Sequence, residues 1–144
     1  MSTESNIIDN LVTTLRSING SPTYVNTIRP QQVEESSQFD SEIELDQYPH
    51  FALGFNASQR IKEPGQLKKT LTIDIICTFQ DSTVSEVESW LSDVEKVLSI
   101  DIRRGGNAFE TWIPSIQRNG DVLDDLQVYI MNVEIQTITA FGSL

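Results

Sequence analysis

The sequence has few of the residues from which compact chemical sites are built. Its 144 residues include one cysteine, Cys77, and one histidine, His50. A single cysteine excludes an internal disulfide, and one cysteine with one histidine cannot close a zinc site. The two residues lie in different sequence settings, so we expect no Cys–His catalytic pair. We expect Cys77, on the apolar face of a strand, to be a buried and inert thiol.

Basic residues and long apolar runs are also scarce. The sequence has ten lysines and arginines and 21 acidic residues, which gives a net charge of −11 and a pI of about 4.3. Nucleic-acid phosphates favour basic surfaces, so this balance excludes general affinity for nucleic acid but not the passage of DNA without adhesion. No apolar run approaches the length of a transmembrane helix, and the first residues lack the pattern of a secretory signal. We expect a cytoplasmic site of synthesis and folding, and no membrane partner.

The clearest pattern runs from residue 67 to residue 98. Apolar and polar residues alternate from 67 to 79, which predicts a half-buried strand. From 84 to 98 the apolar residues are three and four apart, which predicts one stripe of a helix, with Thr83 and Glu86 at capping-box spacing. We predict that this pair forms the core, with the first helix beside it. The predicted core residues are Leu11, Leu15, Leu71, Ile73, Ile75, Phe79, Val87, Leu91, Val94 and Leu98.

The remaining elements follow from similar patterns. A first helix is predicted over about 7–18, with Ser5 as its cap, and a short strand over 23–29. A strand over 51–62 is joined to the next at Pro64-Gly65, a signal for positions i+1 and i+2 of a type II turn. The length favours one domain over residues 1–144. The predicted fold is α+β, a twisted, mostly antiparallel β-sheet with two helices packed on one face and a long β-hairpin.

The last third of the chain carries three weaker signals. Residues 101–108 include Arg103, Arg104 and two glycines, and a flexible turn fits them better than a phosphate cradle. Residues 109–117 predict a strand in which Pro114 indicates an edge or a bulge. Residues 126–139 predict a last strand whose apolar residues change phase, which indicates either a bulge or an end buried on both faces.

Charge is unevenly placed. Residues 31–48 form a long acidic connection, which is either a solvated mobile loop or an arm that becomes ordered on a partner. The hairpin tip holds four of the ten basic residues, and solubilising charge is the plain explanation. We predict instead that the two patches meet across a subunit boundary, head to tail, in a contact that closes into a ring. The predicted interface residues are Glu34, Glu35, Asp40, Glu42, Ile43, Glu44, Leu45, Asp46, Arg60, Lys62, Lys68 and Lys69.

The order of elements resembles a known family. Its landmarks are Ile28-Arg29-Pro30 before the acidic loop, Tyr48-Pro49-His50-Phe51-Ala52-Leu53-Gly54 opening a strand, and the 71–79 strand running into an acidic helix. Together they resemble the tail terminator, or tail completion, proteins of long-tailed bacteriophages, over nearly the whole chain but without a signature motif. The resemblance implies a virion protein, assembled in the host cytoplasm, that forms a hexameric ring. The ring caps the tail tube and forms the head-joining surface.

The resemblance also implies partners. They are the tail tube protein, a head–tail neck protein and a sheath protein, while DNA passes through the bore without specific binding. The family has no catalytic residues, and the sequence shows no nucleophile–base pair, phosphate-binding loop or metal cluster, so we predict no enzymatic activity, no cofactor and no metal. Two alternatives stay open. One is another phage neck or head–tail joining protein. The other is a small acidic α+β binding domain or enzyme, which a monomeric state and a deep pocket would favour.

Overall fold

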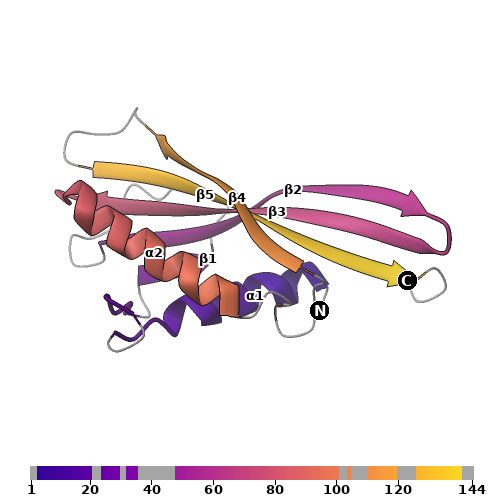
Figure 1. The fold of residues 1–144 in the computed structure, drawn as a ribbon, viewed down its shortest axis with the longest axis horizontal. Coiled ribbons are helices and arrows are strands. Elements are labelled where there is room, and N and C mark those ends of the chain that lie inside the picture. Colours follow the sequence, from indigo (N-terminus) through magenta and orange to yellow (C-terminus); the bar gives the residue numbers. More distant parts are fainter. Residues whose placement is uncertain are drawn as a thin grey trace.

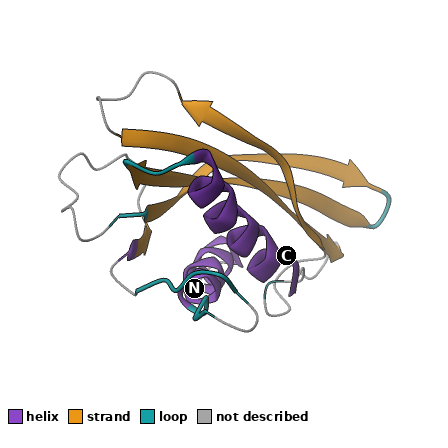
Figure 2. Ribbon diagram, turned by 60° about the vertical axis from the view of Figure 1, so that its left-hand side comes forward, coloured by secondary structure: helices purple, strands orange, loops and turns teal. Residues whose placement is uncertain are grey.

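The computed structural model describes residues 3–20, 24–29, 32–35, 48–100, 104, 110–119 and 126–140. In chain order the elements are α1 (Thr3–Arg16), β1 (Val33–Glu35), β2 (His50–Glu63), β3 (Gln66–Gln80), α2 (Val84–Ile100), β4 (Glu110–Asn119) and β5 (Leu126–Ala140). The strands form one sheet in the order β1-β2-β3-β5-β4, in which only the short β1 runs parallel to its neighbour. Both helices lie on one face of this twisted sheet (Figures 1 and 2). The predicted fold class is confirmed.

The β2–β3 hairpin forms where the Pro-Gly pair predicts it. Glu63 and Gln66 are register partners, so Pro64 and Gly65 make up the whole turn. Gly65 has a φ of 78°, which position i+2 of a type II turn requires and which glycine adopts without steric cost. Proline in turn presets φ at the preceding position. The pair therefore fixes the register of two strands that are 14 and 15 residues long.

The core lies between β3 and the two helices, as predicted. Along β3 the buried side chains alternate with half-buried ones, and the buried set continues onto β2 and β5. Nine of the ten predicted core residues belong to this cluster, while Leu91 is half-buried and packs against it. Cys77 is fully buried, and this burial raises the pKa of its thiol, which keeps the thiol protonated.

The predicted strand over 23–29 is wrong in the part that the structure describes. Between residues 24 and 29 the only strand-like pairing is a single bridge from Thr27 to Asn19. The backbone N–H groups of Val25 and Asn26 instead donate to the carboxylate of Asp93 on α2, at 3.2 and 2.8 Å. A buried side chain thus supplies the acceptors that a neighbouring strand would have supplied. The first helix also begins earlier than predicted, at Thr3, so Ser5 lies inside it.

The acidic connection is shorter than predicted. Residues 33–35 form β1, which pairs with β2, and Val33 is buried in the core. Glu34 and Glu35 therefore belong to the sheet. The other predicted interface residues of this connection lie outside the described residues: Asp40, Glu42, Ile43, Glu44, Leu45 and Asp46.

Arg104 lies in a turn, and residues 101–103 and 105–109 around it lie outside the described residues. Its side chain is fully buried, and its Nη2 donates a 2.7 Å hydrogen bond to the carbonyl of Leu98. That carbonyl is in the last turn of α2, where backbone acceptors are left without intrahelical donors and the helix dipole favours a cation. Residue 104 thus lies in a turn as predicted, but its side chain is buried and caps the helix.

The bulge indicated by Pro114 is present in β4, an edge strand of the sheet. Trp112 and Ser115 pair with Glu134 and Asn132, so two residues of β4 oppose one residue of β5. By contrast, β5 pairs with β3 along its whole length without a register shift. The phase change in β5 therefore reflects burial on both faces, since Val133 faces the helices while Val128, which is also buried, has the opposite parity.

Candidate interaction site

The most prominent surface feature is a projection of the sheet. The far part of the β2–β3 hairpin, with the end of β5 beside it, continues beyond the two helices (Figure 1). We call residues 56–70 of this hairpin the arm. Within the arm, the side chains of residues 56–62 are exposed and those of residues 66–70 are half-buried. A register shift between Phe55 and Ala57 marks the base of the arm.

The arm brings together the four basic residues that the sequence analysis selected. Arg60 pairs with Lys69, while Ile61 pairs with Lys68. Register partners point to the same face of a sheet and alternate along a strand, so Arg60, Lys62 and Lys69 share the face toward the helices. Lys68 lies on the other face beside Ile61, whose side chain is 54 % exposed. The tip therefore presents cations on both faces, with Ile61 beside Lys68 on one face and Leu67 beside Lys62 on the other.

The acidic residues of β1 lie at the opposite end of the sheet. Glu34 pairs in register with Ala52, and its Oε1 lies 3.3 Å from Nε2 of His50. Arg60 is eight residues further along β2 than Ala52, which corresponds to roughly 26 Å at about 3.3 Å per residue. Within one chain, these described parts of the two predicted patches do not meet. Their predicted contact across a subunit boundary stays a prediction.

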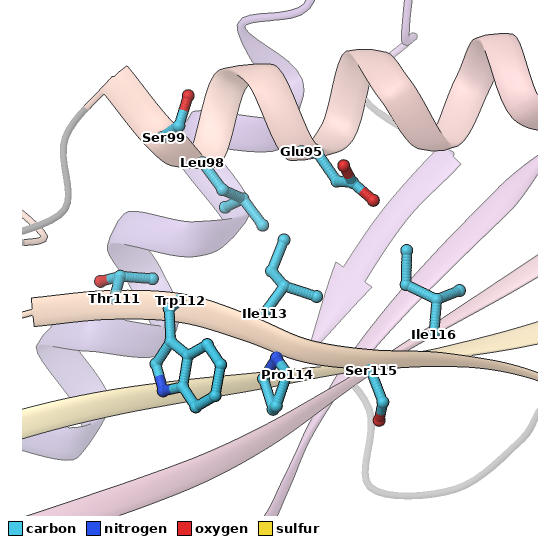
Figure 3. Close-up of a pocket in the computed structure, with 9 residues that line it drawn as sticks. All are labelled: Glu95, Leu98, Ser99, Thr111, Trp112, Ile113, Pro114, Ser115 and Ile116. Carbon is cyan, nitrogen blue, oxygen red and sulfur yellow. The ribbon is translucent and has the colours of Figure 1, made fainter.

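A second feature was not predicted. Two adjoining hollows of about 530 and 460 Å³ lie between α2 and the edge strand β4, and they share Glu95 and Ile116. We call them together the α2–β4 groove. Figure 3 shows the larger hollow. The groove is lined by Val84, Val87, Glu88, Leu91, Ser92, Glu95, Leu98 and Ser99 of α2, by residues 111–116 and Arg118 of β4, and by Tyr129 of β5.

The β4 bulge shapes the floor of this groove. Because the bulge adds a residue, Ile113 and Ile116 both point toward α2, while Trp112 points away (Figure 3). Leu91 and Leu98 contribute apolar surface from the helix side. The floor of the groove is therefore mostly aliphatic.

Charge on the groove comes mainly from the helix. Glu88 and Glu95 are exposed acidic residues of α2 on its wall, while Arg118 of β4 is the basic residue that lines it. Val84, on the same helix, is 69 % exposed. Such a combination of apolar floor and acidic wall suits the docking of a basic, partly apolar segment.

Two observations on the described residues concern metal ligands and the placement of His50 and Cys77. Among the described residues, no group of three or more His, Cys, Asp and Glu side chains is placed to hold a metal ion. His50 pairs with Thr78 while Cys77 pairs with Phe51, so the histidine and the cysteine have opposite parity on the sheet.

Two signals in the sequence pointed toward the groove without identifying it. Pro114 predicted the bulge, and Leu91 and Val84 belonged to the predicted helix stripe. The missing information was that a hollow between α2 and β4 leaves Leu91 and Val84 partly uncovered, which depends on how the helix crosses the twisted sheet. No described helix is both long and apolar enough to cross a membrane. The sequence matches no protein-family model, and no curated protein matches it significantly.

Proposed function

We propose that this chain is a structural virion protein of the tail-terminator type. Copies of it form a hexameric ring that caps the tail tube of a long-tailed phage and presents the head-joining surface. The observation that carries the proposal is the arm, an extension of the sheet with four basic residues on a chain of net charge −11. The element order that resembles the family supports it as well.

A ring follows if the arm of each copy contacts a different, acidic surface on the next copy. Such head-to-tail contacts close into a ring when the rotation between copies allows it. Exposed ion pairs contribute below about 1 kcal/mol each, so the charges set register and choice of partner. Apolar residues supply most of the affinity. The acidic net charge suits a bore through which DNA passes without adhesion, with the tube, neck and sheath proteins as the protein partners.

The groove favours a second candidate, a small acidic binding domain. Its larger hollow, of about 530 Å³, lies within the range of ligand pockets. A binding domain of this kind would be a monomer that takes up a small molecule, whereas a neck or terminator protein forms rings. Sedimentation of the purified chain, with and without the tube protein of the same phage, separates the two candidates.

The direct test is tube capping. The purified chain is added to growing tubes of the tail tube protein encoded in the same genome, and electron microscopy records tube lengths and tube ends. We expect shorter tubes with a ring at one end. Lys68→Glu with Lys69→Glu should impair ring formation while the monomer stays folded, and Glu42→Lys with Glu44→Lys in the same chain should restore part of it if the acidic connection is the acceptor. Tubes of unchanged length and bare ends would refute the proposed function.

A further inference from the structure

We propose that the arm of one copy docks into the α2–β4 groove of the next copy. This inference rests on the homo-oligomer in the proposed function and deepens it by naming the two surfaces in contact. It assigns the acceptor role to the groove, not to the acidic connection at 31–48. The occupant is therefore a second copy of this chain, and its contacting part is the tip around Arg60, Ile61 and Lys62.

Apolar complementarity is the first argument. Ile61 and Val84 are two of the five large hydrophobic side chains that the described residues leave exposed, and they lie on the two surfaces that the proposal joins. The groove floor adds Ile113, Ile116 and half-buried Leu91. Placing Ile61 against this floor removes apolar area of both copies from water, at about 25 cal/mol per Å².

Charge complementarity is the second argument. Ile61 shares one face of the tip with its register partner Lys68, while Arg60 and Lys62, its neighbours in sequence, point to the other face, so the tip carries cations on both faces. The groove wall opposite β4 carries Glu88 and Glu95. Arg118 lies in the smaller hollow and is absent from the lining of the larger one. Among the described residues, the two hollows together therefore offer a cationic tip two acidic side chains against one basic one.

The direction of the arm is the third argument. The arm extends away from both helices, whereas the groove lies against α2 (Figures 1 and 2). A chain cannot insert this tip into its own groove without unpairing β2, β3 and β5, which are in register along the whole arm. The contact is therefore intermolecular and joins two different surfaces, which is the type of contact that builds rings.

Cross-linking tests the proximity directly. Native Cys77 is buried, and burial raises the pKa of its thiol, so it does not compete for a maleimide. The test chain carries Ile61→Cys in the tip and Ser92→Cys in the groove, and it is treated with a short bismaleimide. We expect a ladder of covalent oligomers that continues beyond the dimer, because each copy links to two neighbours.

The matched control carries Ile61→Cys with Asp9→Cys. Asp9 is exposed on α1 and does not line the groove. This chain should stop mainly at the dimer that two Ile61→Cys tips allow. A ladder of equal extent in the test and control chains, or no ladder in the test chain, overturns the proposal.

A charge exchange tests the specificity of the contact. Arg60→Glu with Lys62→Glu, and separately Glu88→Lys with Glu95→Lys, should each weaken self-association roughly tenfold, as two exposed pairs of up to about 1 kcal/mol each allow. Combining all four changes in one chain should restore association, while Asp9→Lys should leave it unchanged. Circular dichroism and thermal melts confirm that every variant is folded.

The failure of this inference is distinct from failure of the proposed function. The chain with all four substitutions can associate as weakly as the summed losses of the two double variants predict. In that case tip and groove do not face each other, even if rings still cap tubes. If reversing Glu34 and Glu35 rescues the tip variant instead, the acceptor is the edge strand β1 and the groove assignment is wrong. Tip-to-groove cross-links in a chain that never caps tubes would support the contact and refute only the function.

Discussion

Asn132 on β5 donates a 2.7 Å hydrogen bond from Nδ2 to Oδ1 of its register partner Asp74 on β3. The other oxygen of Asp74 accepts from Nδ2 of Asn56 at 2.9 Å, and Oδ1 of Asn132 accepts from the hydroxyl of Ser115 at 2.7 Å. A chain of side-chain hydrogen bonds thus crosses four strands. Asn56 lies at the register shift of β2 and Ser115 at the end of the β4 bulge. The chain therefore ties the base of the arm to the strand that shapes the groove.

Removing the central member of this chain should destabilise the protein. Asn132→Ala deletes two side-chain hydrogen bonds, one of them to a carboxylate, at a half-buried position. We expect a loss of about 1–3 kcal/mol in the free energy of unfolding, measured by urea denaturation. Asn56→Ala removes one bond at an exposed position and should cost less than about 1 kcal/mol. Equal losses for the two variants would show that Asn132 does not link the strands.

Asp93 should contribute more to the free energy of unfolding than the exposed Glu95 on the same helix. Its buried carboxylate accepts the backbone N–H groups of Val25 and Asn26 and the side-chain amide of Asn26, which holds residues 24–29 against α2. Asp93→Ala leaves these donors without their acceptor and should cost about 2–5 kcal/mol. Glu95→Gln, two residues further along the helix, should change the free energy of unfolding by less than about 0.5 kcal/mol. A small effect of Asp93→Ala would mean that water replaces the carboxylate.

Two leucines of α2 should differ although both belong to the predicted stripe. Leu98 is 2 % exposed, so Leu98→Ala should cost about 2–5 kcal/mol through lost burial and a cavity. Leu91 is half-buried beside the groove, where solvent already reaches it, so Leu91→Ala should cost less than about 2 kcal/mol in a dissociated monomer. Chemical denaturation of the dilute monomer measures both. A larger loss at Leu91 would place this residue in the core and not at the groove.

The capping box of α2 should make stability depend on pH. Thr83 donates its backbone N–H to Oε1 of Glu86, and Glu86 donates its own to the hydroxyl of Thr83, so the predicted capping box is confirmed. The backbone N–H of Thr83, and after it a side-chain hydrogen bond with Thr83, hold the pKa of the Glu86 carboxyl below its ordinary 4.5. Because the folded-state pKa is lowered, the stabilisation is complete above the ordinary pKa and is lost as pH falls through the folded-state value.

We therefore expect Glu86→Gln to destabilise the protein at neutral pH, and the difference from the parent to shrink as the pH falls below the ordinary pKa of Glu86. Urea denaturation at a series of pH values measures it. Glu88→Gln makes the same change in net charge outside the cap and serves as the control. A difference between parent and Glu86→Gln that is independent of pH would contradict the proposed charge-assisted cap.

Local patterns in the sequence predict most of the elements. Alternation along 67–79, spacing along 84–98 and the Pro64-Gly65 pair act between residues that are neighbours in the chain, so β3, α2 and the hairpin follow from them directly. The capping box and the β4 bulge at Pro114 likewise depend on residues that are close together in the chain. The sequence also predicts that the four basic residues of the arm lie close together, because they flank one turn.

Tertiary structure decides what depends on a distant partner. Residues 24–29 look like a strand in sequence, but Asp93, 67 positions after Asn26, supplies the acceptors. The sequence around Arg104 predicts a flexible turn, and only the tertiary structure shows that its side chain bonds to the end of α2. The α2–β4 groove depends on how a helix crosses a twisted sheet, which no periodicity encodes. The sequence by itself determined the elements and the charge on the arm, while tertiary packing decided which apolar side chains stay uncovered, because burial depends on residues far apart in the chain.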